Sequence, residues 1–106
     1  MKAGISFPRK SDLKITPSLY ATEDVSSDEK LITMKLFSPY APFTWYVCEI
    51  DPETNMAFGF VDGPHGEWGY IDLNELKSAR VFGGRLPAVE QDVYFTPTKF
   101  GDLDRH

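Results

Sequence analysis

The sequence of 106 residues contains a single cysteine, Cys48. One cysteine cannot form an internal disulfide, and with only two histidines the chain lacks the Cys/His ligands of a structural zinc site. No segment approaches the roughly 20 consecutive apolar residues that a membrane-spanning helix needs. Residues 1–15 also lack the apolar run of a secretory signal. The sequence therefore predicts a cytoplasmic protein with no membrane segment.

Basic residues are missing from the centre of the chain. No lysine or arginine lies between Lys35 and Lys77, although the chain contains 11 of them and has a net charge of −5. The same stretch carries seven acidic residues: Glu49, Asp51, Glu53, Asp62, Glu67, Asp72 and Glu75. Charge asymmetry of this kind bears on solubility and partners rather than on fold. It makes this stretch a poor surface for phosphate and favours a protein partner with a basic surface.

Sequence patterns of phosphate binding are absent as well. The Gly83-Gly84 pair is not followed by Lys-Ser/Thr, so it is not a P-loop. The remaining central glycines are spaced as hairpins require, because glycine supplies turn geometry and close backbone approach. Glycine therefore predicts turns here and no nucleotide site.

Catalytic patterns are equally weak. Cys48 lies within an aromatic stretch, which predicts a buried, inert thiol, and His65 is the one internal base candidate. The spacing of the possible metal ligands Glu49, Asp51, Asp62 and His65 matches no known loop of metal ligands. The sequence thus points to no catalytic residue, no metal and no cofactor. An unrecognised metal-dependent hydrolase remains an alternative.

Aromatic residues are abundant, at 14% of the chain, and this suits a sheet-built core. Alternating apolar residues and turn signals predict strands at residues 31–37, 44–50, 56–61, 67–71 and 92–96. Asp72 and Glu75 have the spacing of a capping box, which predicts a short helix ending near Arg80. Residues 18–23 favour a short helical turn. The predicted fold is α+β, an antiparallel β-meander of four to five strands with one or two short helices.

The chain divides into three predicted parts. Residues 1–18 form a loosely held basic arm, residues 19–97 form a single α+β domain, and residues 98–106 form a polar tail. Within the strand at 44–50, alternation places Trp45 and Val47 on one face, with Tyr46, Cys48 and Ile50 on the other. One of these sets must face the core.

The central aromatics and acids are the candidate binding residues. An acidic face with exposed aromatic rings is suited to docking on a basic protein surface, where charge steers the encounter and a ring anchors it. The candidate residues are Trp45, Tyr46, Glu49, Asp62, Glu67, Trp68 and Tyr70. Aromatic rings on a sheet also stack bases, so a single-stranded nucleic-acid-binding module is the alternative, although the missing basic residues count against it.

Several blocks of residues occur in the order of one bacterial family. They are Leu19-Tyr20-Ala21-Thr22-Glu23, Lys35-Leu36-Phe37-Ser38-Pro39, Thr44-Trp45-Tyr46-Val47-Cys48-Glu49, Phe58-Gly59, Glu67-Trp68-Gly69-Tyr70, Leu73-Asn74-Glu75-Leu76 and Glu90-Gln91-Asp92-Val93-Tyr94-Phe95. Over residues 19–97 the chain resembles the domain-of-unknown-function family 2958. Where that family usually has Glu-Arg-Asp, this chain has Glu90-Gln91-Asp92.

Members of that family are small proteins of plasmids, phages and integrating elements, often near DNA-processing or antirestriction genes. The resemblance implies an accessory role in a mobile genetic element and supplies no active site. Together with the acidic aromatic stretch, it leads to the hypothesis of a non-catalytic protein that binds a host or element protein. Counter-defence, of an antirestriction or anti-CRISPR-like kind, is its most specific form.

Overall fold

The computed structural model describes residues 3–4 and 6–104. In chain order its elements, with η for a 3-10 helix, are β1 (Ala3–Gly4), α1 (Lys10–Ile15), η1 (Ser27–Glu29), β2 (Leu31–Ile32), β3 (Met34–Phe37), β4 (Thr44–Asp51), β5 (Met56–Asp62), β6 (Glu67–Asp72), α2 (Leu73–Ser78), β7 (Arg80–Val81), β8 (Leu86–Pro87), β9 (Glu90–Asp92), β10 (Thr98–Lys99) and η2 (Phe100–Asp102). None of the described helices is long and apolar enough to cross a membrane.

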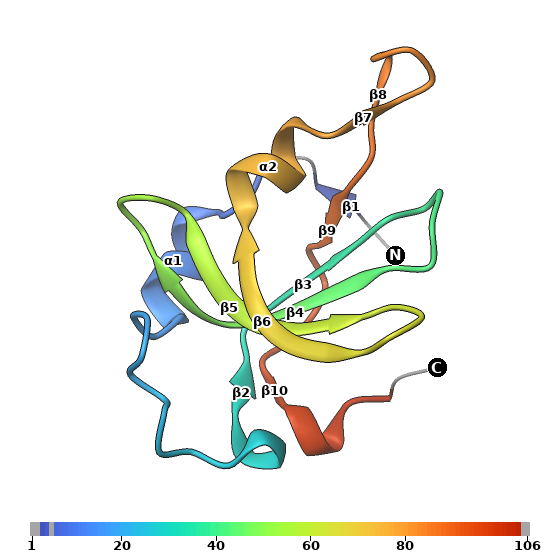
Figure 1. Cartoon of the computed structure of the whole chain (residues 1–106). Helices are drawn as coiled ribbons and strands as arrows, with labels where there is room; N and C mark the ends of the chain where they lie inside the picture. The colour runs from blue at the N-terminus through green and yellow to red at the C-terminus, as the bar shows by residue number, and fades with distance from the viewer. Residues whose placement is uncertain (1–2, 5, 105–106) are drawn as a thin grey trace.

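Within the described part of the chain, the main sheet has six antiparallel strands in the order β1-β9-β3-β4-β5-β6. Strands β3 to β6 follow one another along the chain and across the sheet, so they form the predicted meander (Figure 1). The α+β prediction is confirmed. Two small additional sheets, β2 with β10 and β7 with β8, flank the meander.

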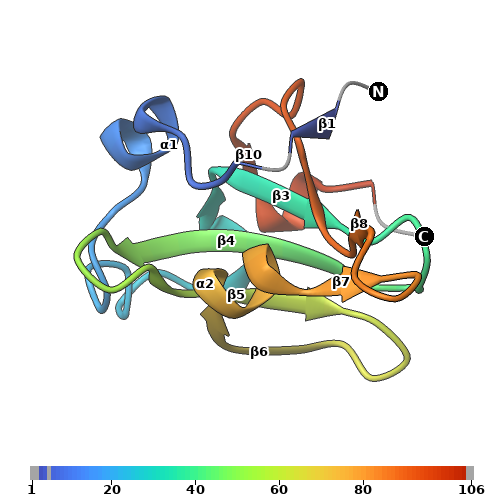
Figure 2. The same cartoon turned by 90° about the horizontal axis from the view of Figure 1, so that it is seen from above.

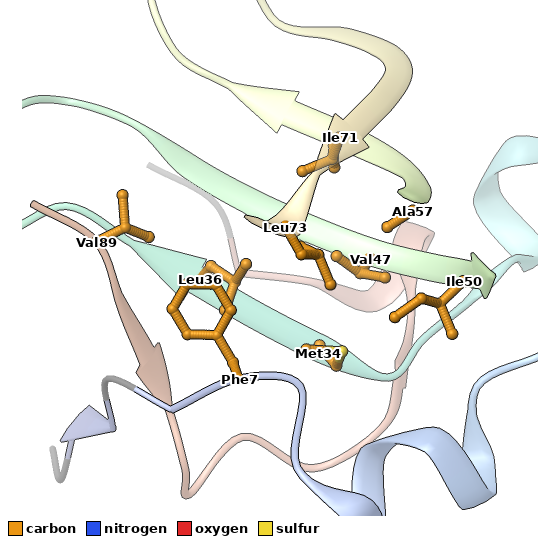
Figure 3. Packing of buried hydrophobic residues seen from close by; sticks show 9 residues of the cluster. All are labelled: Phe7, Met34, Leu36, Val47, Ile50, Ala57, Ile71, Leu73 and Val89. Carbon is orange, nitrogen blue, oxygen red and sulfur yellow. The ribbon is translucent and has the colours of Figure 1, made fainter. Parts of the chain in front are cut away.

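One face of the sheet, here called the helix face, carries the larger core. Its buried side chains come from the meander, from Phe7 in the N-terminal segment, from Leu73 in α2 and from Val89 (Figure 3). Leu13 of α1 and Leu76 of α2 pack against this cluster. Full burial of each large aliphatic or aromatic side chain stabilises the fold by about 1.5–3 kcal/mol. Both helices are short, and their apolar contacts with the sheet hold them in place.

The opposite face, here called the aromatic face, carries a second core cluster. Its buried members are Ile32, Tyr46, Cys48 and Phe100, and rings from β5 and β6 pack around them. Strands β2 and β10 and the helix η2 lie below the sheet in Figure 1, on the side away from α2. Both faces of the meander are therefore covered, and the sheet has no wholly solvated face.

A β-bulge in β4 changes which residues share a face. The register with β5 shifts between Val47 and Glu49, so that Cys48 is an extra residue in the ladder. Tyr46 and Cys48 belong to the aromatic face as predicted, whereas Ile50 packs on the helix face with Val47. The prediction that Ile50 shares a face with Tyr46 is wrong. It assumed strict alternation, and an inserted residue shifts every later side chain of the strand to the other face.

Two strand predictions need correction. The stretch 31–37 is split into β2 and β3, because Leu31 and Ile32 pair with β10 instead of the main sheet. The last strand is β9, Glu90–Asp92, and not residues 92–96. Asp92 ends it, since its side chain accepts a hydrogen bond from the Tyr94 N–H at 3.1 Å and its carbonyl accepts one from the Phe95 N–H at 3.2 Å.

The N-terminal segment is not loosely held where it is described. Phe7 is buried in the helix-face core. Asp12 is buried as well, and it lies in α1, a helix that the sequence did not predict. The Asp12 carboxylate accepts hydrogen bonds from the Arg9 guanidinium and from Gln91 Nε2, both at 3.0 Å. The expectation of a loose arm is therefore wrong, and a buried carboxylate needs such partners.

The C-terminal segment is also more than a polar tail. Thr98 and Lys99 pair with β2, and Phe100 is buried in the aromatic-face core. The predicted division of the chain at 18 and 97 stays a prediction. Residues 1, 2, 5, 105 and 106 of the two predicted end segments lie outside the described residues.

Candidate functional site: a hollow beside Tyr20 and Tyr70

The register of β4, β5 and β6 arranges the aromatic face in rows across the strands. One row runs from Tyr46 through Phe60 to Trp68, and the next from Glu49 through Phe58 to Tyr70. The bulge at Cys48 brings Glu49 onto this face. Without it, Glu49 would alternate to the helix face with Val47. Four of the predicted binding residues are therefore placed together: Tyr46, Glu49, Trp68 and Tyr70.

The row of Tyr46, Phe60 and Trp68 is part of the core. The Phe100 ring lies 4.9 Å from that of Phe60 and 4.7 Å from that of Trp68, measured between centroids. Tyr46 is only 4% exposed. These distances are those of ordinary aromatic packing. Tyr46 and Trp68 thus stabilise the fold, and the C-terminal segment covers the middle of the aromatic face.

Beside this covered centre lies a hollow of about 320 Å³, here called the Tyr70 hollow. Its walls are formed by the row of Glu49, Phe58 and Tyr70. Side chains from the segment between α1 and β2 complete them: Tyr20, Glu23 and Lys30. The Tyr70 ring meets Phe58 edge-on at 5.5 Å and Tyr20 edge-on at 6.5 Å. Tyr20 and Tyr70 are each 58% exposed, which makes them the accessible rings of the site.

The Glu49 carboxylate fastens the loop that closes the hollow. It is only 3% exposed. Its Oε1 accepts a hydrogen bond from the Tyr20 N–H at 2.8 Å, and its Oε2 accepts one from the Thr22 N–H at 3.0 Å and another from the Thr22 hydroxyl. The loop itself is a series of turns, in which Tyr20 has a positive φ of 70°. Glu49 is therefore a buried anchor, not a solvent-facing acid.

Lys30 is the basic residue of the hollow, and it is also buried. Its ammonium donates to the Thr22 carbonyl and, at 3.1 Å, to the Thr22 hydroxyl. Lys30 and Glu49 therefore both form hydrogen bonds with Thr22. This network directs the ammonium at the loop.

The Tyr70 hydroxyl donates to that of Tyr20 across 3.2 Å. This hydrogen bond is the main cause that raises the pKa of Tyr70, and the charges of Glu23 and Glu49 add to it. The charges of Glu23 and Glu49 therefore both act on the Tyr70 hydroxyl. Any cation that enters beside Tyr70 meets the same field.

Cys48 lies under this site and is inert in this conformation. Burial, with the nearby Glu49 charge as a second cause, raises the pKa of the Cys48 thiol to about 11. The thiol donates to the Phe58 carbonyl at 3.4 Å. Nucleophilic cysteines instead have lowered pKa values and partial exposure, so the arrangement agrees with the predicted core thiol.

Three predicted binding residues lie elsewhere. Trp45 and Glu67 belong to the opposite face of the strands, and Trp45 stacks on Phe43 at 5.9 Å. Asp62 lines a second hollow, of about 600 Å³, with Lys35 and Phe43 among its walls. The seven candidates therefore do not form one surface. Among the described residues, no three His, Cys, Asp or Glu side chains are grouped as a metal site requires.

A scan against protein-family models matched residues 12–100 to the family described as "Protein of unknown function (DUF2958)". This match covers most of the chain and includes every wall of the Tyr70 hollow. The chain belongs to the DUF2958 family. The resemblance found in the sequence is thereby confirmed. A search of curated proteins and of solved structures found no match.

In this DUF2958 domain, sequence reasoning missed the loop half of the hollow. Tyr20, Glu23 and Lys30 lie in a polar stretch that indicates only a turn and a loop. Glu49, which binds this loop through Tyr20 and Thr22, is far along the chain. The sequence carries one signal of the site. A glutamate in the middle of an apolar strand must either be exposed or be paired with donors, and Glu49 is paired with the loop.

Proposed function

We propose that this chain is a non-catalytic binding protein, and that its Tyr70 hollow receives a lysine or arginine side chain of a protein partner. The observation that carries the proposal is the meeting of Tyr20, Phe58 and Tyr70 rings with the Glu23 and Glu49 carboxylates around one hollow. A cation over an aromatic face gains about 0.5–1 kcal/mol at an exposed site and about 2 kcal/mol when desolvated.

Charge favours a cation over an anion in this hollow. Two acidic residues and one basic residue line it, and the Lys30 ammonium is already bonded to Thr22. The charged residues of β4, β5 and β6, which lie behind the hollow, are all acidic. A basic partner is therefore attracted before it makes contact, and this attraction falls as salt increases.

The setting of the proposal comes from the family resemblance. We propose an accessory role in a mobile genetic element, in the cytoplasm, with a host or element protein as the partner. The most specific form of this role is counter-defence, in which the acidic domain occupies a basic surface of the partner that otherwise binds DNA. It predicts that the partner loses affinity for DNA when the domain is bound.

Single-stranded nucleic-acid binding is the weaker alternative. Bases would stack on the row of Tyr46, Phe60 and Trp68, but Phe100 covers that row. A chain of phosphates would also meet the acids of the meander. An anisotropy titration with labelled oligonucleotides at low salt tests it, and binding at micromolar protein would favour this alternative over the proposal.

The proposal is tested by an NMR titration of the isotope-labelled domain with blocked arginine and lysine amides and, as control, a blocked glutamate amide. We expect the basic amides to shift the signals of Tyr20, Phe58 and Tyr70, and the glutamate amide to leave them unchanged. Tyr70→Leu and Glu23→Gln each weaken the response. Equal shifts with all three amides, or shifts confined to other parts of the domain, contradict the proposal.

A further inference from the structure

Strand β6 is an edge of the main sheet. Its six residues, Glu67 to Asp72, pair with β5, and in the described part of the chain no strand pairs with its other side. Figure 2 shows β6 as the outermost strand, with no ribbon beyond it. The backbone groups that point away from β5 are thus open to another extended chain.

Edge strands usually carry features that prevent such pairing: lysines, prolines, bulges or a covering loop. β6 has a continuous register with β5 from Glu67 to Asp72, and it contains neither proline nor lysine. Tyr70 is largely exposed on it. Gly69 has no atom within 4 Å of where a Cβ would lie, so the sheet face is uncrowded at that position. Among the described residues, no strand pairs with this edge of β6.

Charge decides what the edge accepts. A second copy that paired antiparallel about the middle of β6 would place Glu67 of one copy opposite Asp72 of the other, at both ends of the ladder. Like charges directly opposite each other destabilise a strand pair. The same two acids favour a strand that carries lysine or arginine near its ends.

We propose that β6 binds an extended, basic segment of a partner protein as an added strand. Neighbouring strands lie about 4.8 Å apart, so a side chain of the added strand on the aromatic face lies beside the exposed Tyr70 ring. A basic residue there reaches the rim of the Tyr70 hollow, near Glu23. This inference rests on the proposed function and adds that the main chain of the partner is recognised through β6.

The probe is a blocked six-residue peptide that alternates lysine with threonine. Its main control is the same peptide with every backbone amide N-methylated, which keeps the charge but removes the donors. Hydrogen exchange of the domain is followed by NMR with and without peptide. At a peptide concentration of about ten times Kd, the outward-pointing β6 amides should exchange roughly tenfold more slowly. The N-methylated peptide should give no such protection.

Variants separate this inference from the function on which it rests. Tyr70→Leu removes about 1 kcal/mol of cation–π attraction, so it weakens peptide binding about fivefold. If lysine amide binds the hollow and the peptide leaves the β6 amides unprotected, the added strand is refuted and the proposed function stands. Equal binding of the N-methylated peptide also refutes it. So does protection of β6 that rises with protein concentration alone, because that indicates a second copy.

Discussion

Replacing Glu49 with glutamine tests how the Tyr70 hollow is built. Glu49→Gln keeps the shape of the side chain but gives it one oxygen and one NH₂ group in place of two acceptors. The wild-type carboxylate accepts from the backbone N–H groups of Tyr20 and Thr22, one on each oxygen. The glutamine can serve one of these donors, and the other faces an NH₂ group. The substitution therefore leaves a partly buried N–H without a partner.

The magnitude follows from the two losses. An unsatisfied buried donor costs about 1–3 kcal/mol, and a hydrogen bond that loses its charge weakens by about 1 kcal/mol. The expected loss is about 2–4 kcal/mol of unfolding free energy, which lowers Tm by roughly 10–20 °C in a domain of this size. The hollow should also loosen locally, with faster amide exchange at Tyr20 and Thr22.

The measurement is urea unfolding of Glu49→Gln beside a matched control, Glu53→Gln. Glu53 is exposed in the turn after β4, so its replacement removes the same charge without removing a buried acceptor. The control should stay within about 0.5 kcal/mol of wild type. If both variants unfold at the same urea concentration, and the Tyr20 and Thr22 amides exchange alike in both, Glu49 does not hold the loop.

Three further predictions concern the sheet that carries the site. Gly59→Ala should lower the free energy of unfolding in urea by about 3 kcal/mol, because the new Cβ would lie 1.9 Å from the Tyr46 carbonyl oxygen. The control, Gly69→Ala, changes the paired position of β6, where no atom lies within 4 Å of a Cβ, and should lower it far less. Equal losses in the two variants would contradict the close approach at Gly59. Burial raises the pKa of Cys48 from 9.0 to about 11. The unfolded chain therefore loses this proton at lower pH than the folded chain, and the free energy of unfolding should fall from pH 9 to pH 11. Cys48→Ala should make this fall smaller, and an unchanged fall in the variant would contradict the raised pKa. Asp72→Ala should lower the free energy of unfolding by about 1 kcal/mol, because the Asp72 carboxylate caps α2 at its second and third N–H groups. Asp72→Asn should lower it little. If the alanine variant is as stable as wild type, the cap is dispensable.

The meander and α2 could be predicted because their signals are local. The three central strands begin at the residues predicted, Thr44, Met56 and Glu67, and extend one residue beyond their predicted ends. The turn after β4 and the cap at Asp72 depend on side chains two or three residues away. Such short-range hydrogen bonds leave a clear pattern in the sequence.

The bulge, the ends of the chain and the hollow could not be predicted for one shared reason. Each depends on contacts between segments far apart in the sequence. Phe7 and Phe100 are isolated apolar residues in polar segments, and only the folded sheet gives them faces on which to pack. Glu49 finds its donors 27 and 29 residues earlier in the chain. Periodicity within one segment carries no information about such pairs.

The acidic centre keeps its electrostatic effect although three of its seven carboxylates have structural roles. Glu49 holds the loop, Asp51 accepts a hydrogen bond from the Glu53 N–H within the turn after β4, and Asp72 caps α2. A hydrogen-bonded carboxylate still carries its charge, and that charge acts over about 8–10 Å at physiological salt. Removing Glu49 or Asp72 would therefore lower both stability and attraction, and it cannot separate them. Glu23 can, because its side chain is exposed at the rim of the Tyr70 hollow. Glu23→Lys should weaken binding of a basic peptide more at 50 mM salt than at 500 mM while leaving the urea midpoint unchanged, and equal weakening at both salt concentrations would refute charge-led recognition.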